Sequence, residues 1–216
     1  MPSPSPRLSD AQLRDAVLRL LESTEPPTIV QAGHPALRQD AVEFTGQLDD
    51  EELARFLELM RLVMHDAPGV GLAAPQLGIP LRIAVLEDRW PVPEEVALER
   101  SREPLPYFAV LNPVYRPLGT ETSAFYEGCL SVQGLQAVVR RPAQVELDWT
   151  DPGGTGHRQK FRGWQARIVQ HETDHLGGTL YLDKAVTRSL SRTEEYLDYW
   201  AEPGIATASE GLGFSA

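Results

Sequence analysis

The sequence QHETDHL, residues 170–176, places His171 and His175 four positions apart with Glu172 directly after the first. Positions i and i+4 lie on one face of an α-helix, so a helix here would direct both imidazoles toward a single metal ion. Glu172 would then be the general base beside that metal. The stretch predicts a metal-binding helix over residues 164–176, which the following pair of glycines would end.

Two histidines do not complete a catalytic metal site, which usually has three protein ligands. The best candidate for the third ligand is Cys129, the single cysteine of the sequence. A thiolate and two imidazoles leave the fourth tetrahedral position open for water. A lone cysteine is more often a small buried apolar side chain, so this ligand needs support from other parts of the sequence.

Composition excludes several classes of protein. The chain has 216 residues, enough for one domain with a sizeable core. Its net charge of -11 argues against DNA and anionic membranes as partners, because the field would repel phosphates. No apolar run is long enough to span a membrane, and residues 1–30 lack a signal-peptide pattern. We therefore expect a cytoplasmic protein.

Hydrophobic periodicity divides the chain into elements. It predicts an amphipathic helix capped by Ser9, a core helix from Asp49 or Asp50 to Pro68, short strands between residues 81 and 162, and a last helix over residues 191–200. We expect an N-terminal extension at residues 1–27, one folded domain at residues 28–200 and a disordered tail at residues 201–216. Residues 87–106, rich in Pro, Glu and Arg, predict an exposed loop.

Three stretches together resemble a known family. GVGLAAPQ at residues 69–76, EGCLS at residues 127–131 and the opening QHETDHL are similar, in order and spacing, to the signature motifs of peptide deformylases. The similarity runs from about residue 28 to residue 200. The stretch GWQARIVQHETDHLGG resembles the organellar branch, and the lack of a transit-peptide pattern favours a bacterial relative. The resemblance implies an α+β fold: antiparallel β-sheets packed around a central metal-binding helix, with an N-terminal and a C-terminal helix.

The resemblance also implies a reaction and a set of site residues. The reaction is removal of the N-formyl group from the initiator formyl-methionine of nascent chains, with release of formate. The implied metal ligands are Cys129, His171 and His175; the implied catalytic residues are Glu172, Gln76 and Leu130; and Val70, Gly71 and Glu127 would bind or support the substrate. Family members often use Fe(II), with Ni, Co or Zn as substitutes. Transient contact with the ribosome is left open.

The residues agree with that chemistry. A bound metal lowers the pKa of water, and Glu172 would accept the proton as the water attacks the formyl carbon. The negatively charged oxygen that forms on the formyl group would accept hydrogen bonds from the Gln76 side chain and the backbone N–H of Leu130. Glu172 would then protonate the departing amine. A thiolate ligand suits Fe(II) and would make such an enzyme sensitive to oxygen.

Three positions depart from the common bacterial pattern or add to it. Many bacterial members carry an arginine nine residues after Glu127, where this chain has Gln136, which leaves open how the peptide beyond its first residue is held. Arg167 is predicted either to pair with Glu127 or to remain a surface residue. Asp174 is predicted either to orient a ligand imidazole or to bond to backbone.

Two other functions stay open at this point. An HExxH metallopeptidase would need a third ligand downstream, and no histidine follows His175. A catalytically silent relative would act as a binding protein, but the motif residues are intact. Release of formate without cleavage of internal peptide bonds would distinguish the deformylase from both.

Overall fold

The fold is α+β with antiparallel sheets, as predicted. The computed structural model describes residues 8–215, so the first seven residues of the predicted N-terminal extension lie outside it. In chain order the elements are α1 (Asp10–Glu22), η1 (Pro35–Arg38), α2 (Asp50–Asp66), β1 (Gly71–Ala73), η2 (Ala74–Leu77), β2 (Ile83–Asp88), α3 (Glu94–Glu99), β3 (Leu105–Pro117), β4 (Thr122–Cys129), β5 (Val132–Pro142), β6 (Gln144–Thr150), β7 (Gly156–Arg162), α4 (Gly163–Leu176), η3 (Tyr181–Lys184), η4 (Thr187–Ser189), β8 (Ser191–Arg192), α5 (Thr193–Tyr199) and α6 (Ala206–Leu212), where η marks a 3-10 turn.

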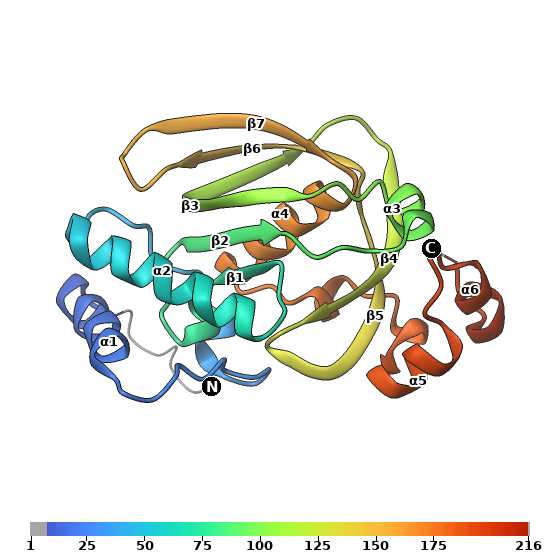
Figure 1. Ribbon diagram of the computed structural model, residues 1–216, viewed down its shortest axis with the longest axis horizontal. Helices are drawn as coiled ribbons and strands as arrows, with labels where there is room; N and C mark the ends of the chain where they lie inside the picture. Colours follow the sequence, from blue (N-terminus) through green and yellow to red (C-terminus); the bar gives the residue numbers. More distant parts are fainter. Residues whose placement is uncertain (1–7, 216) are drawn as a thin grey trace, which may run out of the picture.

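A five-stranded sheet, in the order β1-β2-β3-β6-β7, separates two cores. Alternate side chains of β2 point to opposite faces. Ile83 and Val85 pack in the core that contains α1 and α2, whereas Ala84 and Leu86 pack in the core that contains α4. Figure 1 shows α1 and α2 on one side of this sheet and α4 on the other. The sheet therefore forms the middle layer and presents one face to the helix of the QHETDHL motif.

Helix α4 is held by apolar packing along its sheet-facing side. Its residues Ala166, Ile168, Val169 and Leu176 are buried in the core beneath the sheet. The helix ends at the predicted glycine pair, because Gly178 adopts a φ of +69° and lies too close to the backbone of residues 38–39 for a side chain. The motif histidines therefore lie on a rigid element.

A second sheet, in the order β4-β5-β8, carries Cys129 at the end of its first strand. The β4–β5 pairing is regular from Thr122 to Glu127 and shifts register between Glu127 and Cys129. Such a bulge changes the direction in which the following side chain points. Its position brings the cysteine to the end of the strand next to α4.

The predicted disordered tail is wrong for the described residues. Residues 206–212 form α6, and Ala208 and Phe214 are buried in a small core with Tyr126 and Val138 of the second sheet. The tail has only three large apolar side chains, Ile205, Leu212 and Phe214, among small and polar residues, so its sequence predicts disorder. Burial against a distant hairpin supplies these contacts. Figure 1 shows where α5 and α6 lie, at one end of the molecule.

The N-terminal helix also belongs to a core. Leu13 and Val17 of α1 are fully buried and share a cluster with α2. Arg14 donates to both carboxylate oxygens of Glu52, at 3.0 and 2.9 Å from its Nε. No helix in residues 8–215 has the length and apolar character that crossing a bilayer requires.

Residues 87–106 are more ordered than the exposed loop that the sequence predicted. They contain α3, and the buried Asp88 accepts two hydrogen bonds of 2.8 Å from Arg102. Trp90 Nε1 donates to the carbonyl oxygen of Gly69 at 3.0 Å. The segment therefore packs against the loop that leads into β1.

Candidate active site

The structure brings the three predicted metal ligands together. Sγ of Cys129 lies 3.3 Å from Nε2 of His175, and the ligand atoms of Cys129, His171 and His175 all lie within 4.8 Å of one another. A tetrahedrally coordinated ion with ordinary metal–sulfur and metal–nitrogen bond lengths would hold its sulfur and nitrogen ligand atoms about 3.5 Å apart. The sulfur and the two imidazoles therefore fit a divalent transition-metal ion.

Glu127 fixes the orientation of His171. Its Oε2 lies 2.9 Å from Nδ1 of His171, so the carboxylate accepts the Nδ1–H and leaves Nε2 as the free ring nitrogen. Arg167 donates to Oε1 of Glu127 from 2.6 Å, which confirms the predicted pair over the surface alternative. Burial alone would raise the pKa of Glu127, but the charge and hydrogen bonds of Arg141, together with His171, hold it well below its ordinary value.

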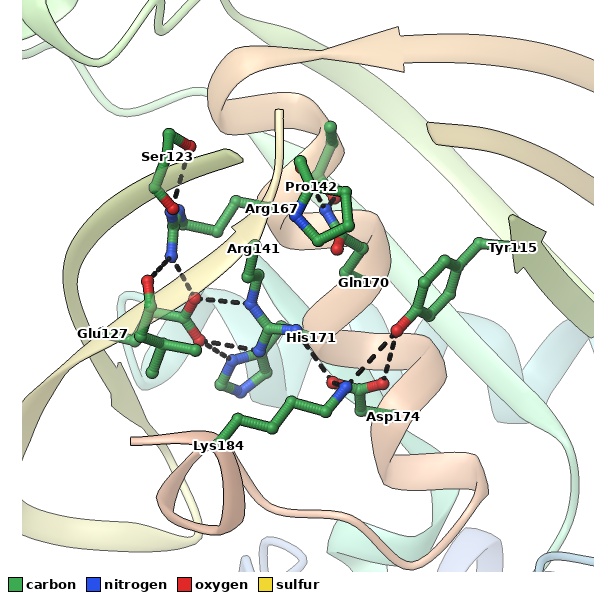
Figure 2. A network of polar contacts seen from close by, with 12 residues as sticks. Tyr115, Ser123, Glu127, Arg141, Pro142, Arg167, Gln170, His171, Asp174 and Lys184 are labelled. Atoms are coloured by element: carbon green, nitrogen blue, oxygen red, sulfur yellow. Dashed lines mark hydrogen bonds and ion pairs between the residues drawn. The ribbon is translucent and has the colours of Figure 1, made fainter. Parts of the chain in front are cut away.

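Arg141 is a buried residue whose role was not predicted from the sequence. Its Nε and Nη2 donate to the two oxygens of Glu127 at 2.6 and 2.9 Å, and its Nη1 donates to Oδ2 of Asp174 at 2.8 Å. Figure 2 shows the guanidinium between the two carboxylates. The alternation of side chains along a strand could have indicated this role. Glu127 pairs with Ala137, and Arg141, four residues further along β5, lies on the same face of the sheet as both.

Asp174 does neither of the two things predicted for it. Among the described residues, its carboxylate forms no hydrogen bond with an imidazole or with a backbone group. The carboxylate instead accepts hydrogen bonds from Arg141, from the hydroxyl of Tyr115 at 3.0 Å and from Nζ of Lys184 at 2.6 Å. Asp174 therefore joins the buried network to two residues on other elements (Figure 2).

Glu172 is buried beside the ligand cluster. Its Oε2 has no hydrogen-bond partner among the described residues, and burial raises the pKa of the carboxyl group to about 7. The carboxyl group lies directly against Gly71, where a Cβ would overlap it. A carboxyl with a pKa near neutrality can both accept and return a proton.

Gln76 and Leu130 border the same cluster. Oε1 of Gln76 accepts from the backbone N–H of Ala73 at 2.8 Å, so its Nε2 is turned the other way, 3.3 Å from Oγ of Ser131 and 3.7 Å from Sγ of Cys129. Leu130 follows Cys129 directly in the chain. Both predicted oxyanion donors are therefore next to the cysteine.

A pocket of about 790 Å³ opens over this site. It is lined by the predicted residues Val70, Gly71, Gln76, Glu127, Cys129, Leu130, His171 and Glu172, with Gln136 also on its wall. The remaining predicted ligand, His175, is buried. Arg100, Trp164 and Tyr196 also line the pocket and were not singled out from the sequence. Their segments are far apart in the chain, and no local pattern marks them.

Comparisons with known proteins identify the family. The polypeptide deformylase family matches residues 26–191. Peptide deformylase 3 of Streptomyces avermitilis is 52% identical over 212 residues, which cover 98% of this chain and 95% of that protein. The chloroplastic peptide deformylase 1A of Solanum lycopersicum is 44% identical over 177 residues, which cover 80% of this chain and 64% of that protein.

A solved structure shows a similar fold. The Met-Ala-Ser-bound class I type b peptide deformylase of Acinetobacter baumannii superimposes with a TM-score of 0.67 at 28% identity, over 75% of this chain and 99% of that one. The resemblance to both bacterial and organellar deformylases is thereby confirmed. The match covers the segments that carry Gln76, Cys129 and the α4 motif, and the chain therefore belongs to the peptide deformylase family of enzymes.

Proposed function

We propose that this chain removes the N-formyl group from formyl-methionine at the start of nascent polypeptides, using a metal held by Cys129, His171 and His175. The observation that carries the proposal is the placement of Glu172. A buried carboxyl with an unpartnered oxygen lies on the same helix as the two imidazoles and against the edge strand β1. Family membership supports the same reaction.

The substrate backbone is proposed to lie along β1. This strand is at the end of the five-stranded sheet, so one of its edges is not paired within that sheet. Extended peptides commonly bind by adding a strand to such an edge. Gly71 has no side chain to block the approach, and Val70 and Glu127 lie on the wall of the same pocket. The methionine side chain would occupy this pocket.

The reaction then follows from the chain's own groups. A bound divalent cation would supply Lewis acidity that acidifies water and polarises the formyl carbonyl. Oε2 of Glu172 takes the proton of the attacking water and later gives it to the amine nitrogen as the C–N bond breaks. Nε2 of Gln76 and the N–H of Leu130 donate to the developing oxyanion. The products are formate and a free methionine amine.

The native metal and the cellular location of the enzyme are proposed as well. We propose Fe(II), with Ni, Co or Zn as substitutes, because members of the family often use Fe(II); a thiolate with two imidazoles suits all of these divalent ions. The enzyme would act in the cytoplasm on nascent chains. Transient contact with the ribosome stays a prediction, as does the role of Gln136 in holding the peptide.

The test is formate release from formyl-Met-Ala-Ser by protein purified anaerobically with Fe(II). We expect turnover in the wild type, and loss of it in Glu172→Gln with one metal still bound per chain. Cys129→Ala should lose the metal as well as the activity. Lys160→Met, an exposed change on β7, is the matched control. Cleavage of internal peptide bonds would instead indicate a metallopeptidase, and metal binding without turnover a silent relative.

A further inference from the structure

Asp174 connects the buried network around His171 to the surface of the molecule. Its side chain is only 8% exposed, and it accepts three hydrogen bonds from three different elements. Arg141 of β5 binds Oδ2 from the inside. Lys184, at the end of η3, binds the same oxygen from outside, while the hydroxyl of Tyr115 in β3 binds Oδ1.

Arg141 is shared between two carboxylates. It gives two donors to Glu127 and one to Asp174, and Glu127 in turn holds Nδ1 of His171. A buried carboxylate that lacks donors attracts the nearest cation more strongly. Without Lys184 and Tyr115, Asp174 would draw Arg141 toward itself and weaken its two-fold contact with Glu127. Figure 2 shows this chain of contacts running from Lys184 to His171.

The turn η3 also contacts His171 directly. The ring of Tyr181, its first residue, stacks on the imidazole with centroids 6.1 Å apart and planes inclined by 20°. The turn is itself anchored, since Asp183 accepts the backbone N–H of Leu180 at 2.8 Å and forms an ion pair with Arg38. One short element therefore packs on the ring of His171 and also delivers the cation that holds Asp174.

We propose that Lys184 and Tyr115 are positioning residues for the metal site. They donate hydrogen bonds to the carboxylate of Asp174, so that Arg141 keeps both of its hydrogen bonds to Glu127. Glu127 in turn keeps His171 in the tautomer whose Nε2 is free. The inference rests on the proposed role of His171 as a metal ligand. A merely structural ion pair at this partly exposed position would affect stability only, and weakly.

Metal affinity of the metal-free protein is the first test. Co(II) is titrated anaerobically into the wild type, Lys184→Met, Lys184→Arg and Tyr115→Phe, and binding is followed by the sulfur-to-cobalt absorption band. We expect Lys184→Met to weaken Co(II) binding about 3- to 10-fold, less than the 10- to 100-fold typical of a residue that contacts the ligand directly. Tyr115→Phe should have a smaller effect in the same direction, and Lys184→Arg should restore affinity.

The control uses the other lysine of the sequence. Lys160 is exposed on β7, so Lys160→Met changes the same charge without touching the network and should bind Co(II) like the wild type. Equal Co(II) affinity in wild type and Lys184→Met would overturn the inference. A wild type that shows no sulfur-to-cobalt band would instead overturn the proposed ligand set, so the two failures are distinguishable.

The tautomer of His171 gives a readout that does not need the metal. The ¹⁵N shifts of its ring, assigned by their loss in His171→Ala and recorded at a pH at which the ring is neutral, should show a proton on Nδ1 in the metal-free wild type. Lys184→Met should move them toward a mixture of tautomers, and Lys184→Arg should reverse the change. Unchanged shifts in Lys184→Met and Tyr115→Phe, with both proteins folded, would show that neither residue positions the imidazole.

Discussion

Replacing Gly71 with alanine tests how tightly β1 approaches the proposed base. A Cβ at this position would lie 2.5 Å from Cγ of Glu172, whereas ordinary van der Waals contacts begin at 3.4 Å. Either the glutamate or the strand must therefore move by about 1 Å, and a misplacement of about 1 Å near the reacting atoms can cost about 100-fold in rate. That factor corresponds to about 2.7 kcal/mol of transition-state stabilisation. We expect kcat to fall by about 100-fold.

The assay is formate release from formyl-Met-Ala-Ser, with metal content measured on the same samples. The metal should be retained, because the three atoms nearest the new methyl group all belong to Glu172 and not to a predicted ligand. Gly156→Ala on β7 is the matched control, since its Cβ would meet nothing within 4 Å. A Gly71→Ala protein with wild-type kcat would refute the close approach, and loss of metal would show that the strand acts on the ligand cluster instead.

Three further changes probe the network, the pH dependence and the tail. Arg141→Met breaks a buried ion pair with Glu127 and should cost about 3–5 kcal/mol in urea unfolding; a loss below about 1 kcal/mol would contradict its structural role. Burial alone would raise the pKa of Glu87, but hydrogen bonds, the largest effect coming from Arg61, outweigh burial and lower the pKa below its ordinary value. The ionised Glu87 therefore stabilises the fold above the ordinary carboxyl pKa, and this stabilisation is lost as the pH falls through the lowered pKa. Glu87→Gln should therefore flatten the acid-side decline in Tm, and parallel curves for the two proteins would reject this. Phe214→Ala should destabilise by about 3 kcal/mol, and an unchanged urea midpoint would show that the tail is not packed.

Local patterns predicted the motif helix and its end. The spacing of His171 and His175 identifies one face of a helix, and two glycines stop it, because both signals lie within a few residues of each other. The same holds for the start of α2: of the two predicted starts, Asp49 is the N-cap, and it forms a capping box with Glu52. Cys129 could be placed beside the histidines only through the resemblance to a family, since 42 residues separate it from His171.

Other parts could not be read from local patterns. The ordering of residues 206–212 depends on contacts with the β4–β5 hairpin, more than sixty residues earlier in the chain. The sequence leaves the partner of Arg167 open, because a surface position and a buried pair with Glu127 fit the same spacing. Burial of both residues decides it.

The sequence by itself determined the helix that carries two predicted metal ligands and a glutamate and, through the resemblance of three motifs to a family, the family and its α+β class. It could do so because helix periodicity and capping are properties of neighbouring residues, and because the order and spacing of motifs can be read along the chain. Only the tertiary structure decided that Arg141 joins Glu127 to Asp174, that Lys184 and Tyr115 complete this network, and that Gly71 meets Glu172. These contacts join residues from separate strands, turns and helices, and their geometry exists only once the two sheets have packed around α4.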